Sequence, residues 1–217
     1  MDAPNRTARI AAFDVDAQKG FTSLCPDELP VPGGHEIAGT LNTMATYADL
    51  RVASKDAHSP NALWVVDTPA EMLKPTGLPN ADLTWVRHCE VGSRGFESLD
   101  GLPAAHEYDF MVFKGVEPAL HPYGACYHDL ADSISTGVIE YLRDRNVDTV
   151  LVGGLALEFC VATTARQLRK AGFAVVLYLP ATRALNPANA IGTMLDLGMA
   201  GVQIAETEQE LAHLVGA

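Results

Sequence analysis

Apolar residues along the chain follow two spacings, one typical of buried strands and one typical of helices. Short runs rich in β-branched residues predict strands at 9–16, 51–55, 109–115, 149–153, 173–179 and 202–204. Apolar residues at helical spacing predict helices at 35–50, 135–145, 158–170, 187–197 and from 207 onward, where Thr207 and Glu210 have the spacing of a capping box. This alternation predicts an α/β fold, with a mostly parallel central sheet between two layers of helices.

Residues 59–109 interrupt this regularity. Prolines recur throughout the segment, and neither spacing persists in it. A loop of such length inside a compact domain is usually either functional or disordered. Trp64, Trp85 and the pair His88–Cys89 favour an ordered, functional segment. We therefore expect a single domain over residues 1–217, with an irregular insertion at about 59–109 that carries a metal or substrate loop.

Composition and charge exclude several classes of partner. The chain has 217 residues, of which 48% are hydrophobic and 19% are charged, as expected for one globular domain with a full core. Its formal net charge of −12 would repel nucleic acid and anionic membranes. The four cysteines form no CxxC pair, and the segment 1–9 lacks the apolar core of a signal peptide. These features, with no apolar run long enough to span a membrane, predict a cytoplasmic protein.

A candidate nucleophile follows the most apolar strand. The run Thr149–Val152 ends in Gly153–Gly154, and Cys160 lies in or near the first turn of the next helix. The N–H groups and the dipole of a helix N-terminus favour a thiolate over a thiol. A buried cysteine is more often inert. Cys160 becomes a stronger candidate because Asp16 and Lys114 end two other predicted strands.

The carboxyl ends of parallel strands lie along one edge of a sheet, so Asp16, Lys114 and Cys160 can meet there. Cys160 as a thiolate would attack an electrophilic carbonyl. Asp16 would take its proton and return it to a leaving amine. Lys114 would hold Asp16 in place and favour the thiolate through its positive charge. We expect these three residues to be catalytic.

A second group of residues has the spacing of a metal site. Asp56 and His58 are two positions apart in an extended segment, so both side chains can face one ion, and His88 follows thirty residues later. One carboxylate and two imidazoles leave coordination positions open, as in catalytic sites. The pattern Asp-x-His alone carries a high risk of a false match. Asp67 or Glu71 could add a further carboxylate.

The spacing of residues does not assign a metal-binding or catalytic role to two other candidates, Cys89 and His121. Cys89 could in principle bind a soft metal, but in a strand it would point away from its neighbour His88, so we expect it to be structural. His121 lies in the loop after Lys114 and could border the site.

Several short motifs resemble, in their order and spacing, those of a known family. From about Arg9 to Ile204 the chain resembles the nicotinamidase/pyrazinamidase branch of the isochorismatase-like cysteine hydrolases. The motifs are Asp16-Ala17-Gln18 followed by Phe21, Val31-Pro32-Gly33-Gly34, Asp56-Ala57-His58, Trp85-x-x-His88-Cys89, Phe113-Lys114-Gly115, Tyr123-Gly124-Ala125 and Gly154-Leu155-Ala156-Leu157-Glu158-Phe159-Cys160-Val161.

The resemblance implies an isochorismatase-like three-layer αβα fold and deamidation of nicotinamide, with pyrazinamide as a further substrate, through a cysteine thioester. It implies the triad Asp16, Lys114 and Cys160. It also implies a non-proline cis peptide at Leu155–Ala156, which would aim the N–H groups of Ala156 and Cys160 at the carbonyl oxygen as an oxyanion hole.

The resemblance also implies one divalent metal ion on Asp56, His58 and His88, with zinc first and iron or manganese as alternatives. The ion would bind the pyridine nitrogen of nicotinamide. Aromatic walls would orient the ring, although core packing explains each candidate equally well, and the family is often oligomeric. The candidate wall residues are Phe21, Trp64 and Tyr123.

The chain departs from the family pattern at several positions. Ser59 stands where proline is usual, Gly124 replaces a serine, and Asp14 is a charged residue inside a predicted strand that would need a buried partner. Two alternatives to a nicotinamidase therefore stay open. The chain could be a related cysteine hydrolase for another small amide or carbamoyl compound, or a catalytically silent binding protein.

Overall fold

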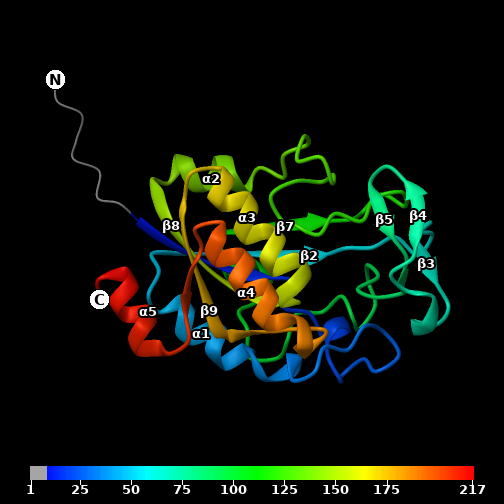
Figure 1. Cartoon of the computed structure of the whole chain (residues 1–217), viewed down its shortest axis with the longest axis horizontal. Coiled ribbons are helices and arrows are strands. Elements are labelled where there is room, and N and C mark those ends of the chain that lie inside the picture. Colours follow the sequence, from blue (N-terminus) through cyan, green and yellow to red (C-terminus); the bar gives the residue numbers. More distant parts are fainter. Residues whose placement is uncertain (1–8) are drawn as a thin grey trace.

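A six-stranded parallel sheet forms the centre of the molecule in the computed structural model, which describes residues 9–217 (Figure 1). Its strands are β1 (Arg9–Val15), β2 (Leu50–Asp56), β7 (Phe110–Lys114), β8 (Val147–Leu155), β9 (Ala174–Arg183) and β10 (Gln203–Ala205). They lie in the order β10-β9-β8-β1-β2-β7, and every neighbouring pair is parallel. The predicted α/β class is confirmed, and this sheet is wholly rather than mostly parallel.

Helices cover both faces of the sheet (Figure 1). The helices are α1 (Ala38–Ala45), α2 (Val138–Asp144), α3 (Ala162–Lys170), α4 (Ala190–Met199) and α5 (Glu208–Val215). Phe13 and Val152 pack into a core shared with α2, α3 and α4, whereas the adjacent Ala12 and Leu151 pack into a core shared with α1 and α5. Successive residues of a strand point to opposite faces, so an almost continuous apolar run fills both cores. The predicted three-layer sandwich is confirmed.

The boundaries of several elements differ from those that the spacing predicts. Helix α1 is shorter than the expected 35–50, because a 3₁₀ turn at Gly34–Glu36 precedes it. Thr207 caps α5 as expected, since its Oγ1 accepts the N–H of Glu210 at 3.2 Å. The carboxylate of Glu210 accepts the N–H of Glu206 at 2.7 Å, one residue before the position that a capping box requires.

The irregular segment 59–109 contains short strands outside the main sheet. Two of them pair in parallel and two form an antiparallel hairpin at one end of the molecule (Figure 1). These strands are β3 (Val65–Val66), β4 (Pro75–Leu78), β5 (Ala81–Leu83) and β6 (Trp85–Val86). Trp64 and Trp85 are buried, so a packed aromatic core orders the inner part of the segment.

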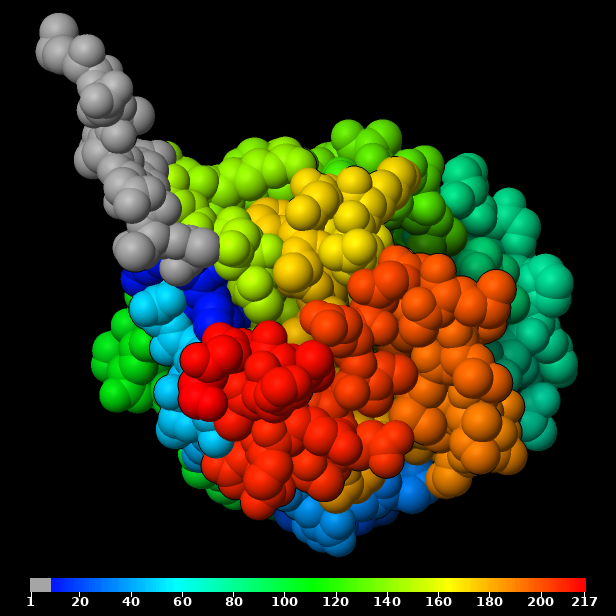
Figure 2. Space-filling model, turned by 60° about the vertical axis from the view of Figure 1, so that its left-hand side comes forward, coloured from blue at the N-terminus to red at the C-terminus, as the bar shows by residue number. Residues whose placement is uncertain are grey.

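The C-terminal helices α4 and α5, orange to red in Figure 2, form much of one face of the molecule. Helix α4 exposes three large apolar side chains, Ile191, Leu195 and Met199, at 69%, 66% and 88% of their surface. Within residues 9–217, no helix is both long and apolar enough to cross a membrane.

Candidate active site

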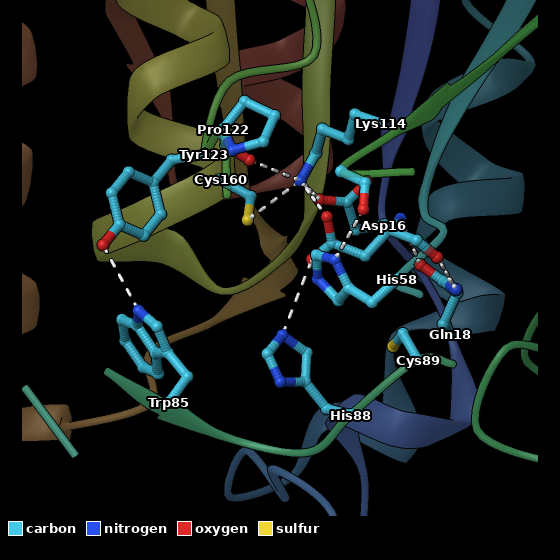
Figure 3. Close-up of polar contacts among 12 residues, drawn as sticks. Asp16, Gln18, His58, Trp85, His88, Cys89, Lys114, Pro122, Tyr123 and Cys160 are labelled. Carbon is cyan, nitrogen blue, oxygen red and sulfur yellow. Dashed lines mark hydrogen bonds and ion pairs between the residues drawn. The ribbon is translucent and has the colours of Figure 1, made fainter. Parts of the chain in front are cut away.

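Four neighbouring strands deliver polar side chains to one buried point at the carboxyl edge of the sheet (Figure 3). Asp16 follows β1, Asp56 ends β2 and Lys114 ends β7, while Cys160 lies in the turn after β8. All four residues are almost completely buried. The order β8-β1-β2-β7 makes these strand ends adjacent in space although they are far apart in the sequence.

The ammonium group of Lys114 is at the centre of this cluster (Figure 3). Its Nζ is 3.0 Å from Oδ2 of Asp16 and 3.7 Å from Sγ of Cys160. It also pairs with Oδ1 of Asp56 and donates to the carbonyl oxygen of Pro122 at 3.2 Å. One buried cation therefore contacts the candidate nucleophile and two carboxylates. The expected trio of Asp16, Lys114 and Cys160 lies together.

Polar side chains near the strand ends hold the two carboxylates in position. The hydroxyl of Ser54 donates to Oδ1 of Asp16 at 2.6 Å, and Asp16 itself has a φ of 46°, an uncommon value for a residue with a side chain. The amide of Gln18 donates to the carbonyl oxygen of Asp56 at 2.8 Å and accepts its N–H at 2.8 Å. In the sequence, Gln18 stands out only as part of a motif, and Ser54 has no feature that marks it.

Burial dominates the protonation of the candidate nucleophile and base. It raises the pKa of the Cys160 thiol well above its ordinary value, although the nearby Lys114 acts to lower it. Burial also raises the pKa of Asp16, against the opposing charge of Lys114. The position near a helix N-terminus favours a thiolate, and burial of Cys160 acts in the opposite direction.

The turn that carries Cys160 has an unusual backbone. The peptide bond Leu155–Ala156 is cis, the geometry that the family resemblance implies. Gly154 has a φ of 128°, and any side chain at this position would overlap the backbone of Val15. The turn Leu157–Val161 that follows is π-helical, an arrangement often found at functional sites.

Asp56 also faces a cluster of histidines. Its Oδ2 is 3.4 Å from Nε2 of His58 and 3.9 Å from Nε2 of His88. The Nδ1 of His88 is 2.7 Å from the carbonyl oxygen of Val86, and that of His58 is 3.3 Å from the carbonyl oxygen of Gly115. Such contacts orient metal-binding histidines, because they leave Nε2 as the free electron-pair donor. The expected Asp56, His58 and His88 therefore lie together.

A third histidine, His121, completes the cluster. One nitrogen from each of His58, His88 and His121 lies within 4.8 Å of the others. Burial, together with the neighbouring His58, lowers the pKa of His88 to about 3 and that of His121 well below its ordinary value, so both rings are neutral at pH 7. Neutral imidazoles and a carboxylate form a donor set that suits a divalent cation.

The further ligands considered from sequence lie elsewhere. Asp67 and Glu71 are exposed, and neither joins a cluster of metal-ligand type within the described part of the chain. Cys89 is buried but stays outside the histidine cluster, and its N–H donates to Glu28 at 2.8 Å. His121 lies in a loop in which apolar residues have no regular spacing. Its position soon after Lys114 was the feature of the sequence that indicated a place near the site.

A cavity that opens to solvent connects the two groups of residues. Asp56, His88, His121 and Cys160 all line it. Phe21 and Tyr123 form part of its walls, as expected. Five further wall residues were not predicted as such from the sequence, namely Leu29, Val31, Trp85, Phe159 and Leu185. Flat apolar walls around a few polar groups are typical of a pocket for a small aromatic molecule.

Trp64 lies in a different place from the expected wall position. It does not line the cavity; its ring packs 4.7 Å from the ring of His58 and 4.3 Å from that of His121. Its Nε1 donates to the carbonyl oxygen of Leu120 at 3.0 Å. Trp64 therefore packs against the histidines outside the lining of the cavity.

Two of the departures from the family pattern have a local explanation. Asp14 is buried, and its Oδ2 is 2.7 Å from Nη2 of Arg51 and accepts the hydroxyl of Tyr108 at 2.8 Å, so this oxygen is paired although Oδ1 has no hydrogen-bond partner. At Gly124, a side chain would overlap the amide of Gln167, which fills this space and accepts a backbone N–H at 3.1 Å.

A cysteine, a carboxylate and a lysine at the strand ends of a parallel sheet are the parts of a cysteine hydrolase site. The Isochorismatase domain family matches residues 13–209, and the chain belongs to this family.

Individual relatives within the family indicate a narrower class of enzyme than the family match does. The chain is 31% identical to the nicotinamidase of Acinetobacter baylyi over 195 residues, which cover 86% of this chain and 85% of that protein. Its structure is similar to that of PnC1 from L. infantum in complex with nicotinate, with a TM-score of 0.76, 28% identity and coverage of 92% and 93%. It is also similar to the pyrazinamidase of Pyrococcus horikoshii in complex with zinc, with a TM-score of 0.72, 26% identity and coverage of 92% and 99%.

Proposed function

We propose that this protein is a metal-dependent nicotinamidase, which hydrolyses nicotinamide to nicotinate and ammonia. The observation that carries the proposal is the shared cavity: Cys160 with Asp16 and Lys114 lies at one side, and the histidine cluster with Asp56 lies at the other. The aromatic walls suit a flat ring. Relatives at up to 31% identity named as nicotinamidases support this substrate.

The histidine cluster fits a divalent metal ion. Nε2 of His58 and both ring nitrogens of His121 are buried and have no hydrogen-bond partner, and each such group needs a compensating interaction. Asp56, His58 and His88 would hold the ion, and zinc is supported by the zinc complex of the Pyrococcus horikoshii relative. A bound divalent ion would supply a Lewis acid for the ring nitrogen of the substrate.

The first half of the reaction makes a thioester. The proton of the Cys160 thiol passes to the carboxylate of Asp16, and the sulfur attacks the carboxamide carbon. The carbon–nitrogen bond then breaks, and Asp16 returns the proton to the departing nitrogen, which leaves as ammonia. The charge of Lys114 stabilises Asp16 and the developing thiolate throughout. We assign the N–H groups of Ala156 and Cys160 to the carbonyl oxygen.

The second half of the reaction regenerates the enzyme. Asp16 takes a proton from water, whose oxygen attacks the thioester carbon. The carbon–sulfur bond breaks, and Asp16 returns its proton to the sulfur of Cys160. The acid product loses the second proton of the water to solvent and leaves as nicotinate. The raised pKa of Asp16 suits this role, because a stronger base accepts a proton from thiol and water more readily.

Ammonia release from nicotinamide, pyrazinamide and a carbamoyl compound, measured side by side, tests the proposal. We expect nicotinamide to be hydrolysed with the highest kcat/KM, and metal analysis to find one divalent ion per chain. Preference for the carbamoyl compound would instead support a related cysteine hydrolase. No hydrolysis of any amide, with a Cys160 that resists alkylation, would support a silent binding protein.

A further inference from the structure

We propose that His121 is a fourth protein ligand of the metal ion, an inference that rests on the metal site proposed above. The side chain is only 4% exposed, and neither Nδ1 nor Nε2 has a hydrogen-bond partner. A buried imidazole with two unpaired nitrogens carries a free-energy cost unless something binds it. The rings of His58 and His88 are the nearest groups of metal-ligand type, with one nitrogen of each within 4.8 Å of a nitrogen of His121.

The spacing of the three nitrogens fits a common ion. Metal–nitrogen bonds of about 2.0–2.1 Å place two ligands of one ion at most about 4.2 Å apart. The observed upper limit of 4.8 Å needs only small side-chain movements to reach that range. The rings of His58 and His121 are stacked, with centroids 5.1 Å apart and an interplanar angle of 22°. They come from two different segments of the chain, which are also joined by the hydrogen bond from the Leu63 N–H to the carbonyl oxygen of Pro118 at 2.9 Å.

The backbone and the neighbouring side chains hold His121 in this position. Its N–H donates to the carbonyl oxygen of Asn80 at 2.7 Å, and the carbonyl oxygen of the next residue, Pro122, accepts from Lys114 at 3.2 Å. The rings of Trp64 and Trp85 pack against the imidazole at 4.3 and 5.8 Å. The ring is therefore preorganised toward the cavity, as metal ligands usually are.

A fourth protein ligand changes the coordination of the ion. Four ligands complete a tetrahedral site and close it to substrate. Oδ2 of Asp56 is 3.4 Å from Nε2 of His58 and 3.9 Å from Nε2 of His88, so Asp56 and the three imidazoles would supply four ligands. An ion that also bound the ring nitrogen of a substrate would then need more than four coordination positions. The number of protein ligands therefore differs between the two roles: His121 would add one if it binds the ion and none if it only lines the pocket.

The test compares His121→Gln with His106→Gln, a change at a histidine on the surface, and with His88→Gln. Each protein is stripped with a chelator and reloaded with Co²⁺ or Zn²⁺. The readouts are the visible absorption of the cobalt protein and the Zn²⁺ affinity in competition with a coloured chelator. We expect His121→Gln to alter the cobalt spectrum and to weaken zinc binding about 10–100-fold. His106→Gln should match the unchanged protein, and His88→Gln should lose metal.

The unchanged protein offers a second measurement, which does not depend on a variant that folds. Proton NMR of the cobalt protein should show hyperfine-shifted, exchangeable N–H signals from three histidines. Two such signals, or a His121→Gln protein with unaltered spectrum and affinity, would overturn the assignment even if KM for nicotinamide rises. An unchanged protein that binds no metal would instead overturn the metal site as a whole, and the two failures are therefore distinguishable.

Discussion

The two sides of the cavity are built in different ways. On one side, Asp16, Lys114 and Cys160 are fixed by strands β1, β7 and β8, whose parallel hydrogen bonds position the backbone. On the other side, His88 and His121 come from irregular segments and are held by packing and by single hydrogen bonds. The strand ends, with the turn that follows β8, position the first group, whereas the second depends on side chains and, as we propose, on the metal.

Asp56 joins the two sides. Its Oδ1 pairs with Lys114, and its Oδ2 faces Nε2 of His58 and of His88. Lys114 and then His58 hold the pKa of Asp56 well below its ordinary value, although burial acts to raise it, so the carboxylate stays ionised. Asp56 is therefore the residue that contacts both Lys114 on the first side and the histidines on the second. The variants below test how independent the two sides are.

Replacing Cys160 with alanine should have the largest effect, because it removes the nucleophile of the sheet side. We expect nicotinamide hydrolysis to fall by about 10⁴-fold or more, as measured by ammonia release. Metal content should not change, since Cys160 is outside the histidine cluster. Cys25→Ala is the matched control and should keep its activity. A Cys160→Ala protein that retains a tenth of the activity would contradict the account.

Lys114→Met should have the next largest effect, which is a lower free energy of unfolding. It leaves the carboxylates of Asp16 and Asp56 buried without their cation. Breaking a buried ion pair by removal of one partner costs about 3–5 kcal/mol. The free energy of unfolding, measured in urea, should fall by this amount, while Lys170→Met, at a pair with Asp132 on the surface, should change it little. Equal effects of the two variants would refute the central position of Lys114.

Gly115→Ala tests the histidine side alone. Gly115 has a φ of 71°, and a methyl group there would lie 2.6 Å from Nδ1 and Cε1 of His58. The ring must move, so we expect zinc affinity to fall about 10-fold or more, while the Cys160 thiol keeps its rate of alkylation. Gly39→Ala, in open space on α1, is the control. Unaltered zinc affinity would show that the position of His58 is not critical.

Ser54→Ala should have the smallest effect, a shift in pH dependence. Burial raises the pKa of Asp16 above 3.8, and the hydrogen bond from Ser54 acts to lower it. Asp16 acts as a base only when ionised, so kcat/KM should decline as pH falls through this raised pKa. Removing the Ser54 hydroxyl raises the pKa further and should move the acid limb of the pH profile to higher pH. An acid limb that moves to lower pH would contradict the assignment of Asp16.

The contrast between the two sides also explains how far the sequence could predict the structure. Parallel strands are apolar runs that end abruptly, so the positions of Asp16, Lys114 and Cys160 along one edge follow from pattern alone. His88 was predicted from its residue type, with Asp56 and His58, and the resemblance agrees with this prediction. His121 and Trp85 depend on how an irregular chain folds back on itself, and no spacing predicts that. Ser54 could not be predicted, because a serine in a strand has no pattern that indicates a functional role. Only the pairing of β1 with β2 brings its hydroxyl to Asp16.

Binding of pyridine-3-carbaldehyde, labelled with ¹³C at the carbonyl, tests most directly that the sulfur and the ring pocket form one site. The aldehyde carbon resembles the reacting carbon of nicotinamide, and addition of the Cys160 thiol would convert it to a tetrahedral centre. The account predicts that the carbonyl signal is replaced by a thiohemiacetal signal, which is absent from Cys160→Ala and reversed by excess nicotinamide. An aldehyde signal that stays unchanged in the metal-loaded protein, or an adduct that survives in Cys160→Ala, would contradict it.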